Sequence, residues 1–254
     1  MEQAVYLRIS QELESSPKAL ALSKKFPCLR EDDTSSPYLS LDSDGLSLIS
    51  GDKVLKGDFT RMLHRVKNGL SKEFLVKTAK IKDASYPLTA LDATAGLGED
   101  SFLLAAAGFE VKLFERNPVI FELLSDALER ARADSELSAI ASRMELTFED
   151  SITAMKSLNY SPDVILLDPM FPERQKSALV KKKLQMIQML EIPCDDEREL
   201  LIAAMRLGPK KLIVKRPPKG PYLAGIKPDY STEGKAVRFD CFVSPLDKIH
   251  KYDP

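Results

Sequence analysis

The chain contains 254 residues, of which 44% are hydrophobic and 30% are charged, and its formal net charge is −1. This composition permits a sizeable core beneath a charged surface and excludes disordered and fibrous classes of protein. Because the net charge gives no overall attraction to nucleic acid, any such binding must depend on local clusters of charge.

The three cysteines are widely spaced and form no C-x-x-C motif, which argues against a disulfide framework or a zinc site. The longest apolar stretches are too short to cross a bilayer, and the first residues lack the apolar run of a secretion signal. We therefore expect a soluble, cytoplasmic protein that binds no metal and contacts no membrane.

Residues 1–85 combine short apolar alternations with turn-rich polar stretches, a mixture that predicts a small N-terminal α+β subdomain. Within this part, residues 61–81 carry apolar side chains at steps of three and four residues. That spacing is typical of helix, and Gly69 is expected to be its weak point.

From residue 86 to residue 254, short apolar runs alternate with longer helical patterns, which predicts a Rossmann-like α/β domain with a parallel sheet. The predicted strands are Leu88–Ala93, Glu110–Glu115, Met144–Phe148, Val164–Asp168, Lys211–Lys215 and Val237–Val243. The predicted helices are Asp100–Ala107, Pro118–Ala133, Lys176–Leu190 and Asp195–Leu207.

A turn containing Gly96 and Gly98 follows the first predicted strand and leads into a helix that begins near Glu99 and Asp100. The turn could be an ordinary strand–helix connection, or it could let a ligand approach the backbone. The two carboxylates would repel the pyrophosphate of a dinucleotide, but they suit the cationic sulfonium and ammonium of S-adenosylmethionine. Asp100 could also cap the helix.

Acidic residues end the next two predicted strands. Glu115 could accept hydrogen bonds from the ribose hydroxyls of a nucleoside, or it could be a solvated charge. Asp150, with Ser151 beside it, could accept a hydrogen bond from an adenine amino group, or it could cap the next helix. The carboxyl ends of parallel strands meet at one edge of a sheet, so these side chains are expected to lie together.

The fourth predicted strand ends in Asp168-Pro169-Met170-Phe171-Pro172. This segment is similar to the D/N-P-P-F/Y/W loop of enzymes that methylate NH2 groups. Asp168 and the carbonyl of Pro169 could accept hydrogen bonds from the two hydrogens of an exocyclic amine, and Phe171 could stack on the base. The alternative is a proline-rich structural turn.

Two groups of basic residues are expected to contact RNA phosphates, although lysine runs are usually solvated surfaces. The first group, after this loop, is Arg174, Lys176, Lys181, Lys182 and Lys183. The second group, in and around the fifth predicted strand, is Lys210, Lys211, Lys215, Arg216 and Lys219.

These motifs closely resemble the bacterial 16S ribosomal RNA guanine(1516)-N2 methyltransferases. The similarity covers nearly all of residues 87–245, and its most specific parts are residues 167–172 and 175–182. The resemblance implies methylation of a guanine N2 in 16S ribosomal RNA, within the small ribosomal subunit or an assembly intermediate. It also implies cofactor contacts at Glu99, Asp100, Glu115, Arg116, Asp150, Ser151 and Asp168.

Three other functions stay open at this point. The loop chemistry would serve another amino-group methyltransferase, acting on adenine N6 or on a protein glutamine. The fold could also belong to an RNA-binding module without enzyme activity, or to a nicotinamide-dependent oxidoreductase despite Glu99 and Asp100.

Overall fold

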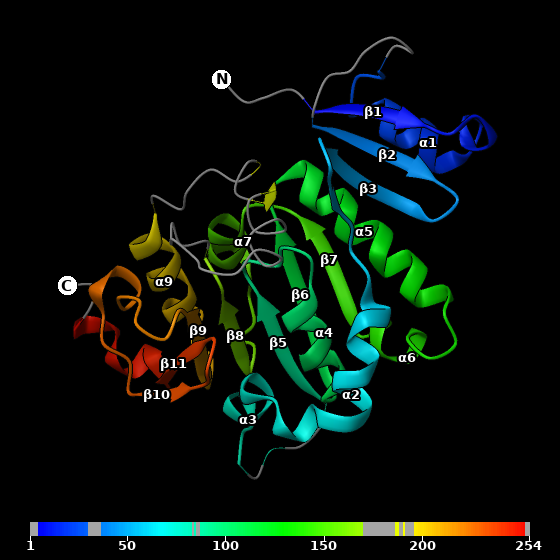
Figure 1. Cartoon of the computed structure of the whole chain (residues 1–254). Coiled ribbons are helices and arrows are strands. Elements are labelled where there is room, and N and C mark those ends of the chain that lie inside the picture. The colour runs from blue at the N-terminus through cyan, green and yellow to red at the C-terminus, as the bar shows by residue number, and fades with distance from the viewer. Residues whose placement is uncertain are drawn as a thin grey trace.

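A computed structural model describes residues 5–29, 37–82, 84, 87–169, 186–187, 190 and 196–251 of the chain. These residues form a four-stranded sheet near the N-terminus and a seven-stranded sheet with helices on both faces (Figure 1). Among the described residues, no helix is long and apolar enough to cross a membrane.

The seven-stranded sheet has the order β10-β11-β9-β8-β5-β6-β7. The strands β5 to β9 run parallel, whereas β11 lies antiparallel between β9 and β10. Within this sheet β5 is the first strand along the chain and lies in the interior, with β6 on one side and β8 on the other. The strand order therefore reverses between β5 and β8, which is where such sheets bind ligands. The strands are β5 Leu88–Asp92, β6 Phe109–Glu115, β7 Met144–Phe148, β8 Val164–Leu167, β9 Lys211–Arg216, β10 Tyr230–Glu233 and β11 Arg238–Val243.

Helices cover the two faces of this sheet because side chains alternate along each strand. Leu166 packs in a core with α3 (Phe74–Ala79), α4 and α5, and Leu167 packs on the opposite face with α7 and α9. All four residues of β8 are buried, as expected for the centre of a parallel sheet. The helices of the main domain are α4 Glu99–Ala106, α5 Pro118–Ala133, α6 Ser138–Ala141, α7 Ser151–Ser157 and α9 Glu197–Arg206.

The N-terminal sheet has the order β1-β2-β3-β4 and packs on α5, which lies between the two sheets (Figure 1). Its core includes Val119, Ile120 and Leu123 of α5 together with leucines of the strands. The elements of this part are β1 Tyr6–Ile9, α1 Pro17–Ser23, β2 Tyr38–Asp42, β3 Gly45–Ser50 and β4 Lys53–Leu55.

The segment after this sheet is helical, as predicted, and it breaks at Gly69. A 3-10 turn at Phe59–Met62 leads into α2 Leu63–Gly69, and α3 Phe74–Ala79 follows. Phe59 stacks on Phe102 of α4 with ring centroids 4.7 Å apart, so this segment joins the core of the large sheet. The division of the chain at residue 85 stays a prediction, and this packing favours a division before Phe59.

Several predicted boundaries agree closely with the structure. The helix Pro118–Ala133 begins and ends as expected, because Pro118 suits the first turn and Asn117 Oδ1 accepts hydrogen bonds from two backbone N–H groups of α5. The short helix α6 and the edge strand β10 were not predicted, and α7 was expected only as the helix that Asp150 could cap, without bounds. The predicted helix Lys176–Leu190 lies largely outside the described residues. The remaining 3-10 turns are Gln11–Leu13, Leu70–Lys72, Leu223–Gly225 and Pro245–Lys251.

Candidate active site

The two glycines of the turn between β5 and α4 have different surroundings. Both have positive φ, 54° at Gly96 and 73° at Gly98, which favours glycine at each position. A Cβ added at Gly96 would meet no atom within 4 Å, whereas one at Gly98 would lie 2.8 Å from Leu124 Cδ1. Gly96 therefore presents backbone to open space, and Gly98 allows close packing of α4 on α5.

Glu115 ties the end of β6 to this turn. Its side chain is buried, and its carboxylate accepts hydrogen bonds from the backbone N–H of Gly96 at 3.0 Å and of Asn117 at 2.7 Å. Burial raises the pKa of Glu115, although these backbone N–H groups act in the opposite direction. The carboxylate thus lies beside the open glycine turn, and its contact with ribose stays a prediction.

Asp150 caps α7, which was one of the two roles considered for it. Its Oδ1 accepts a hydrogen bond from Thr153 N at 3.0 Å, while its Oδ2 lies 3.4 Å from Nη1 of Arg116. Ser151 is the first residue of α7 and is 9% exposed. Capping uses only one carboxyl oxygen, so contact of Asp150 with adenine stays a prediction.

Asp168 lies directly after β8, next to the glycine turn. Its backbone N–H donates a hydrogen bond to Thr94 Oγ1 at 2.6 Å, which joins the start of the proposed catalytic loop to the segment after β5. Pro169, the next residue, is buried. Phe171, which was predicted to stack on the base, lies outside the described residues.

Lys215 places an ammonium group between two of the predicted site residues. Its Nζ lies 2.5 Å from Asp100 Oδ2 and 2.9 Å from Asp168 Oδ2. Asp100 therefore faces the catalytic loop from the first turn of α4, whereas Glu99 beside it is exposed. Sequence reasoning treated Lys215 only as an RNA-contacting cation.

The structure corrects the expectation of RNA contact for most of the second basic group, which comprises Lys210, Lys211, Lys215, Arg216 and Lys219. The ammonium of Lys211 donates to the carbonyl oxygens of Thr78 and Lys80, and the ammonium of Lys210 pairs with Asp163 at 2.7 Å. Both lysines stand at the start of β9, at the opposite edge of the sheet from Asp168. The Arg216 side chain is 1% exposed and donates to Pro221 O. Lys219 is exposed beyond β9, and the first basic group lies outside the described residues.

Asp92 is a buried acid at the end of β5 that sequence reasoning did not assign a role. It is 2% exposed, and its carboxylate accepts hydrogen bonds from Ser101 Oγ at 2.5 Å and from Thr94 N at 3.0 Å. Burial raises the pKa of Asp92 to about 7, and the nearby Asp100 and Asp168 add to the rise. An acid that ends a largely apolar strand just before a glycine turn is the signal that could have identified it.

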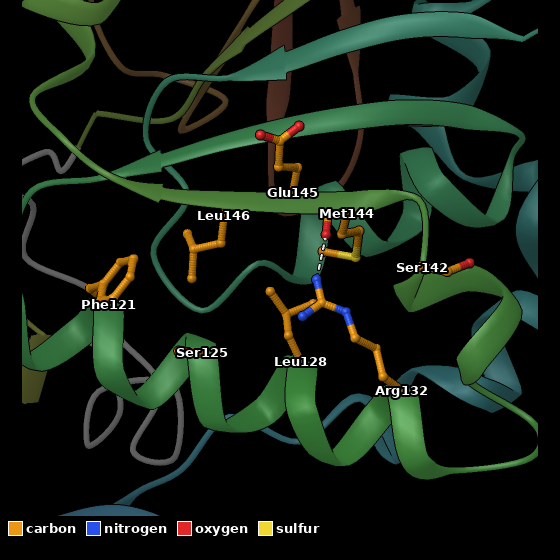
Figure 2. Close-up of a pocket in the computed structure, with 8 residues that line it drawn as sticks. All are labelled: Phe121, Ser125, Leu128, Arg132, Ser142, Met144, Glu145 and Leu146. Carbon is orange, nitrogen blue, oxygen red and sulfur yellow. Dashed lines mark hydrogen bonds between the residues drawn. The ribbon is translucent and has the colours of Figure 1, made fainter. Parts of the chain in front are cut away.

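A hollow of about 420 Å³ lies elsewhere, between α5 and the edge strand β7 (Figure 2). Arg132 of α5 reaches across it and donates a hydrogen bond to Met144 O at 2.7 Å. The predicted site residues are not among those that line it, which are Phe121, Ser125, Leu128, Arg132, Ser142, Met144, Glu145 and Leu146.

The groups gathered at the carboxyl edge of the large sheet suit a cationic nucleoside. Open backbone at Gly96 permits close approach, and Glu115, Asp100 and Asp168 supply carboxylates around it. Within the described parts of the chain, no group of three or more His, Cys, Asp or Glu side chains could hold a metal ion. The strand order and this glycine turn define a class I methyltransferase that depends on S-adenosylmethionine.

Comparisons with known proteins agree with this class. A family model described as a putative SAM-dependent methyltransferase matches residues 21–244. Ribosomal RNA small subunit methyltransferase J of Thioalkalivibrio sulfidiphilus is 39% identical, over 92% of this chain and 95% of that protein. Its namesake from Pseudomonas aeruginosa is 45% identical, over 70% of this chain and 69% of that protein.

A solved structure is similar over almost the whole chain. It is the crystal structure of a SAM-dependent methyltransferase from Neisseria gonorrhoeae, with a TM-score of 0.74, 30% identity, and coverage of 94% of this chain and 96% of that one. The chain therefore belongs to this family of S-adenosylmethionine-dependent methyltransferases, and its relatives include proteins named ribosomal RNA small subunit methyltransferase J. S-adenosylmethionine is its cofactor, so the prediction of this cofactor over a dinucleotide is confirmed.

Proposed function

We propose that the chain methylates the exocyclic N2 of a guanine, of the position 1516 type, in 16S ribosomal RNA. The observation that carries this proposal is the position of Asp168 and Pro169 directly after β8, joined by the Asp168–Thr94 hydrogen bond to the segment that follows β5. The names of the relatives supply the substrate class, because each is called a ribosomal RNA small subunit methyltransferase.

The cofactor is assigned to the groups around the glycine turn. Glu115, which lies beside the open backbone of Gly96, would accept hydrogen bonds from the ribose hydroxyls, and the carboxylates of the first turn of α4 would stabilise the cationic end of the cofactor. When bound, S-adenosylmethionine supplies an electrophilic methyl group. The full set of proposed cofactor-binding residues is Gly96, Gly98, Glu99, Asp100, Glu115, Arg116, Asp150, Ser151 and Asp168.

The catalytic role belongs to Asp168, Pro169 and Phe171. An exocyclic amine is a poor nucleophile because its lone pair is delocalised into the ring. A carboxylate at Asp168 and a carbonyl at Pro169 accept hydrogen bonds from the amine hydrogens, which favours a pyramidal nitrogen with its lone pair available. Phe171 offers a stacking face to an unpaired or flipped base. Such positioning can supply roughly 7–11 kcal/mol of the barrier reduction.

We expect the protein to bind this RNA in the cytoplasm, within the small ribosomal subunit or an intermediate of its assembly. Lys219, exposed just beyond β9, can contact phosphates near the site. The net charge of −1 makes such local contacts necessary for RNA binding.

The test is incubation of the protein with methyl-labelled S-adenosylmethionine and small subunits from cells that lack this modification, with naked 16S RNA in parallel. We expect label in guanine N2, and the two arms show whether the assembled subunit is required. Label in adenine or in a ribosomal protein would contradict the substrate assignment in favour of another amino-group methyltransferase. RNA binding without any transfer would indicate a module that has lost its activity.

A further inference from the structure

Lys215 joins three elements that meet at the proposed catalytic loop. It lies near the end of β9, and its ammonium contacts Asp100 of α4 at 2.5 Å and Asp168 after β8 at 2.9 Å. The side chains of Lys215 and Asp100 are 24% and 20% exposed, whereas that of Asp168 is 42% exposed. The ammonium is therefore partly shielded from solvent, which strengthens its contacts relative to those of fully exposed ion pairs and restricts the positions of both carboxylates.

The charges around Lys215 are mostly negative. From β5, the buried Asp92 lies close enough to influence both carboxylates, and from β9 the Arg216 guanidinium influences Asp168. Glu99 stands beside Asp100 on α4, and both acids interact electrostatically with Arg65 of α2, which pairs with Glu73. Burial alone would lower the pKa of Lys215, but Asp168 and Asp100 raise it above its usual value, so the ammonium keeps its charge.

We propose that Lys215 is a positioning residue for methyl transfer, which holds Asp168 as a carboxylate aimed at the substrate amine. This inference rests on the proposed function of Asp168. The ion pair engages Oδ2 of Asp168. Only an ionised carboxylate can accept hydrogen bonds from the amine with either oxygen, since a protonated one carries a hydroxyl that donates.

Without Lys215, three acids would face one another. Partial burial raises the pKa of Asp168, Asp100 adds to that rise, and the Lys215 ammonium opposes it. A neutral side chain at position 215 should therefore leave Asp168 protonated over part of the working pH range. Turnover would then fall at low pH and recover as the pH rises.

Replacement of Lys215 should have different kinetic effects if this residue positions Asp168 than if it contacts RNA. If Lys215 bound a phosphate, Lys215→Met would raise KM for RNA and reduce the dependence of binding on salt. If it positions Asp168, the variant lowers kcat by roughly 10²-fold near neutral pH and leaves KM for RNA within about twofold. The acidic limb of the kcat profile should also move up by about one pH unit or more.

The experiment compares wild type with Lys215→Met, Lys215→Arg and the control Lys156→Met, which removes a surface ion pair to Glu199 at the far end of α7. We expect Lys215→Arg to restore the position of the acidic limb and Lys156→Met to match wild type. Normal kcat and an unchanged pH profile in Lys215→Met would overturn the inference, as would a change in KM alone.

A second measurement needs no substrate, and so separates this inference from the proposed function. The Asp168 carboxyl can be titrated by ¹³C NMR, with its signal assigned from Asp168→Asn. We expect its pKa to rise by about one unit or more in Lys215→Met. An equal pKa in the two folded proteins would refute the role of Lys215, whatever RNA is methylated. A wild-type protein that methylates no RNA, with the pKa rise present, would contradict only the proposed substrate.

Discussion

Replacement of Asp92 by Asn should remove a large pH dependence from the stability of the protein. Asp92 is 2% exposed at the end of β5, and burial raises its pKa to about 7. The same carboxyl in an unfolded chain has a pKa of about 4. The folded protein therefore binds this proton more tightly than the unfolded chain does.

The difference between the folded and unfolded pKa values determines the sign and size of this pH dependence. A raised folded-state pKa contributes stability that is fully present below pH ~4 and is lost as the pH rises through ~7. Three pKa units at 1.36 kcal/mol each correspond to about 4 kcal/mol in total, of which roughly 3 kcal/mol falls between pH ~5 and pH ~8.5. This is a large share of the 5–15 kcal/mol that is typical of folded proteins.

Asparagine fits the geometry of this site without needing a proton. Its Oδ1 can accept the hydrogen bond from Thr94 N, and its Nδ2 can donate to Ser101 Oγ, which now donates to Asp92. Asp92→Asn should therefore unfold at higher urea concentration than wild type at pH ~8.5, by about 3–4 kcal/mol, and by far less at pH ~5.

The assay is urea unfolding of wild type and Asp92→Asn across this pH range, with the difference in unfolding free energy plotted against pH. Glu115 also has a raised pKa, but it is present in both proteins and cancels in the difference. Glu12→Gln, at an exposed acid, should follow the wild-type curve. Parallel stability curves for wild type and Asp92→Asn would show that Asp92 is already ionised at low pH in the folded protein. That result would contradict the raised pKa of Asp92 and the predicted change in stability.

Three further variants test the proposed catalytic loop, the proposed cofactor site and the packing of the glycine turn. Asp168→Ala should lower kcat by at least roughly 10²-fold with the fold intact. The control Asp163→Ala, at the other end of β8, should keep near-normal turnover. If Asp168→Ala itself kept near-normal turnover, Asp168 would have no catalytic role. Glu115→Ala should weaken S-adenosylmethionine binding by roughly tenfold or more in calorimetry, and unchanged affinity would exclude the ribose contact. Gly98→Ala should cost about 2 kcal/mol in thermal unfolding, because its Cβ would lie 2.8 Å from Leu124 Cδ1 at positive φ.

Local sequence determined the order of elements in the main domain. The apolar run Val164–Leu167 predicted a buried strand, and Asn117-Pro118 predicted the start of α5. Strand β10 has no comparable signal, because it lies at the sheet edge and three of its four residues are exposed. The bounds of α7 were not predicted because this helix is only seven residues long, although Asp150 was recognised as its possible cap.

The sequence by itself also placed Gly96, Glu115, Asp150 and Asp168 at one edge, because parallel strands all end on the same side of a sheet. Only the tertiary structure decided which side chains meet there. Lys215 contacts Asp168 because β9 pairs with β8, and it contacts Asp100 because α4 covers that face. Such contacts depend on strand order and on the face to which each side chain points. These are properties of the assembled sheet, and a local pattern of residues does not contain them.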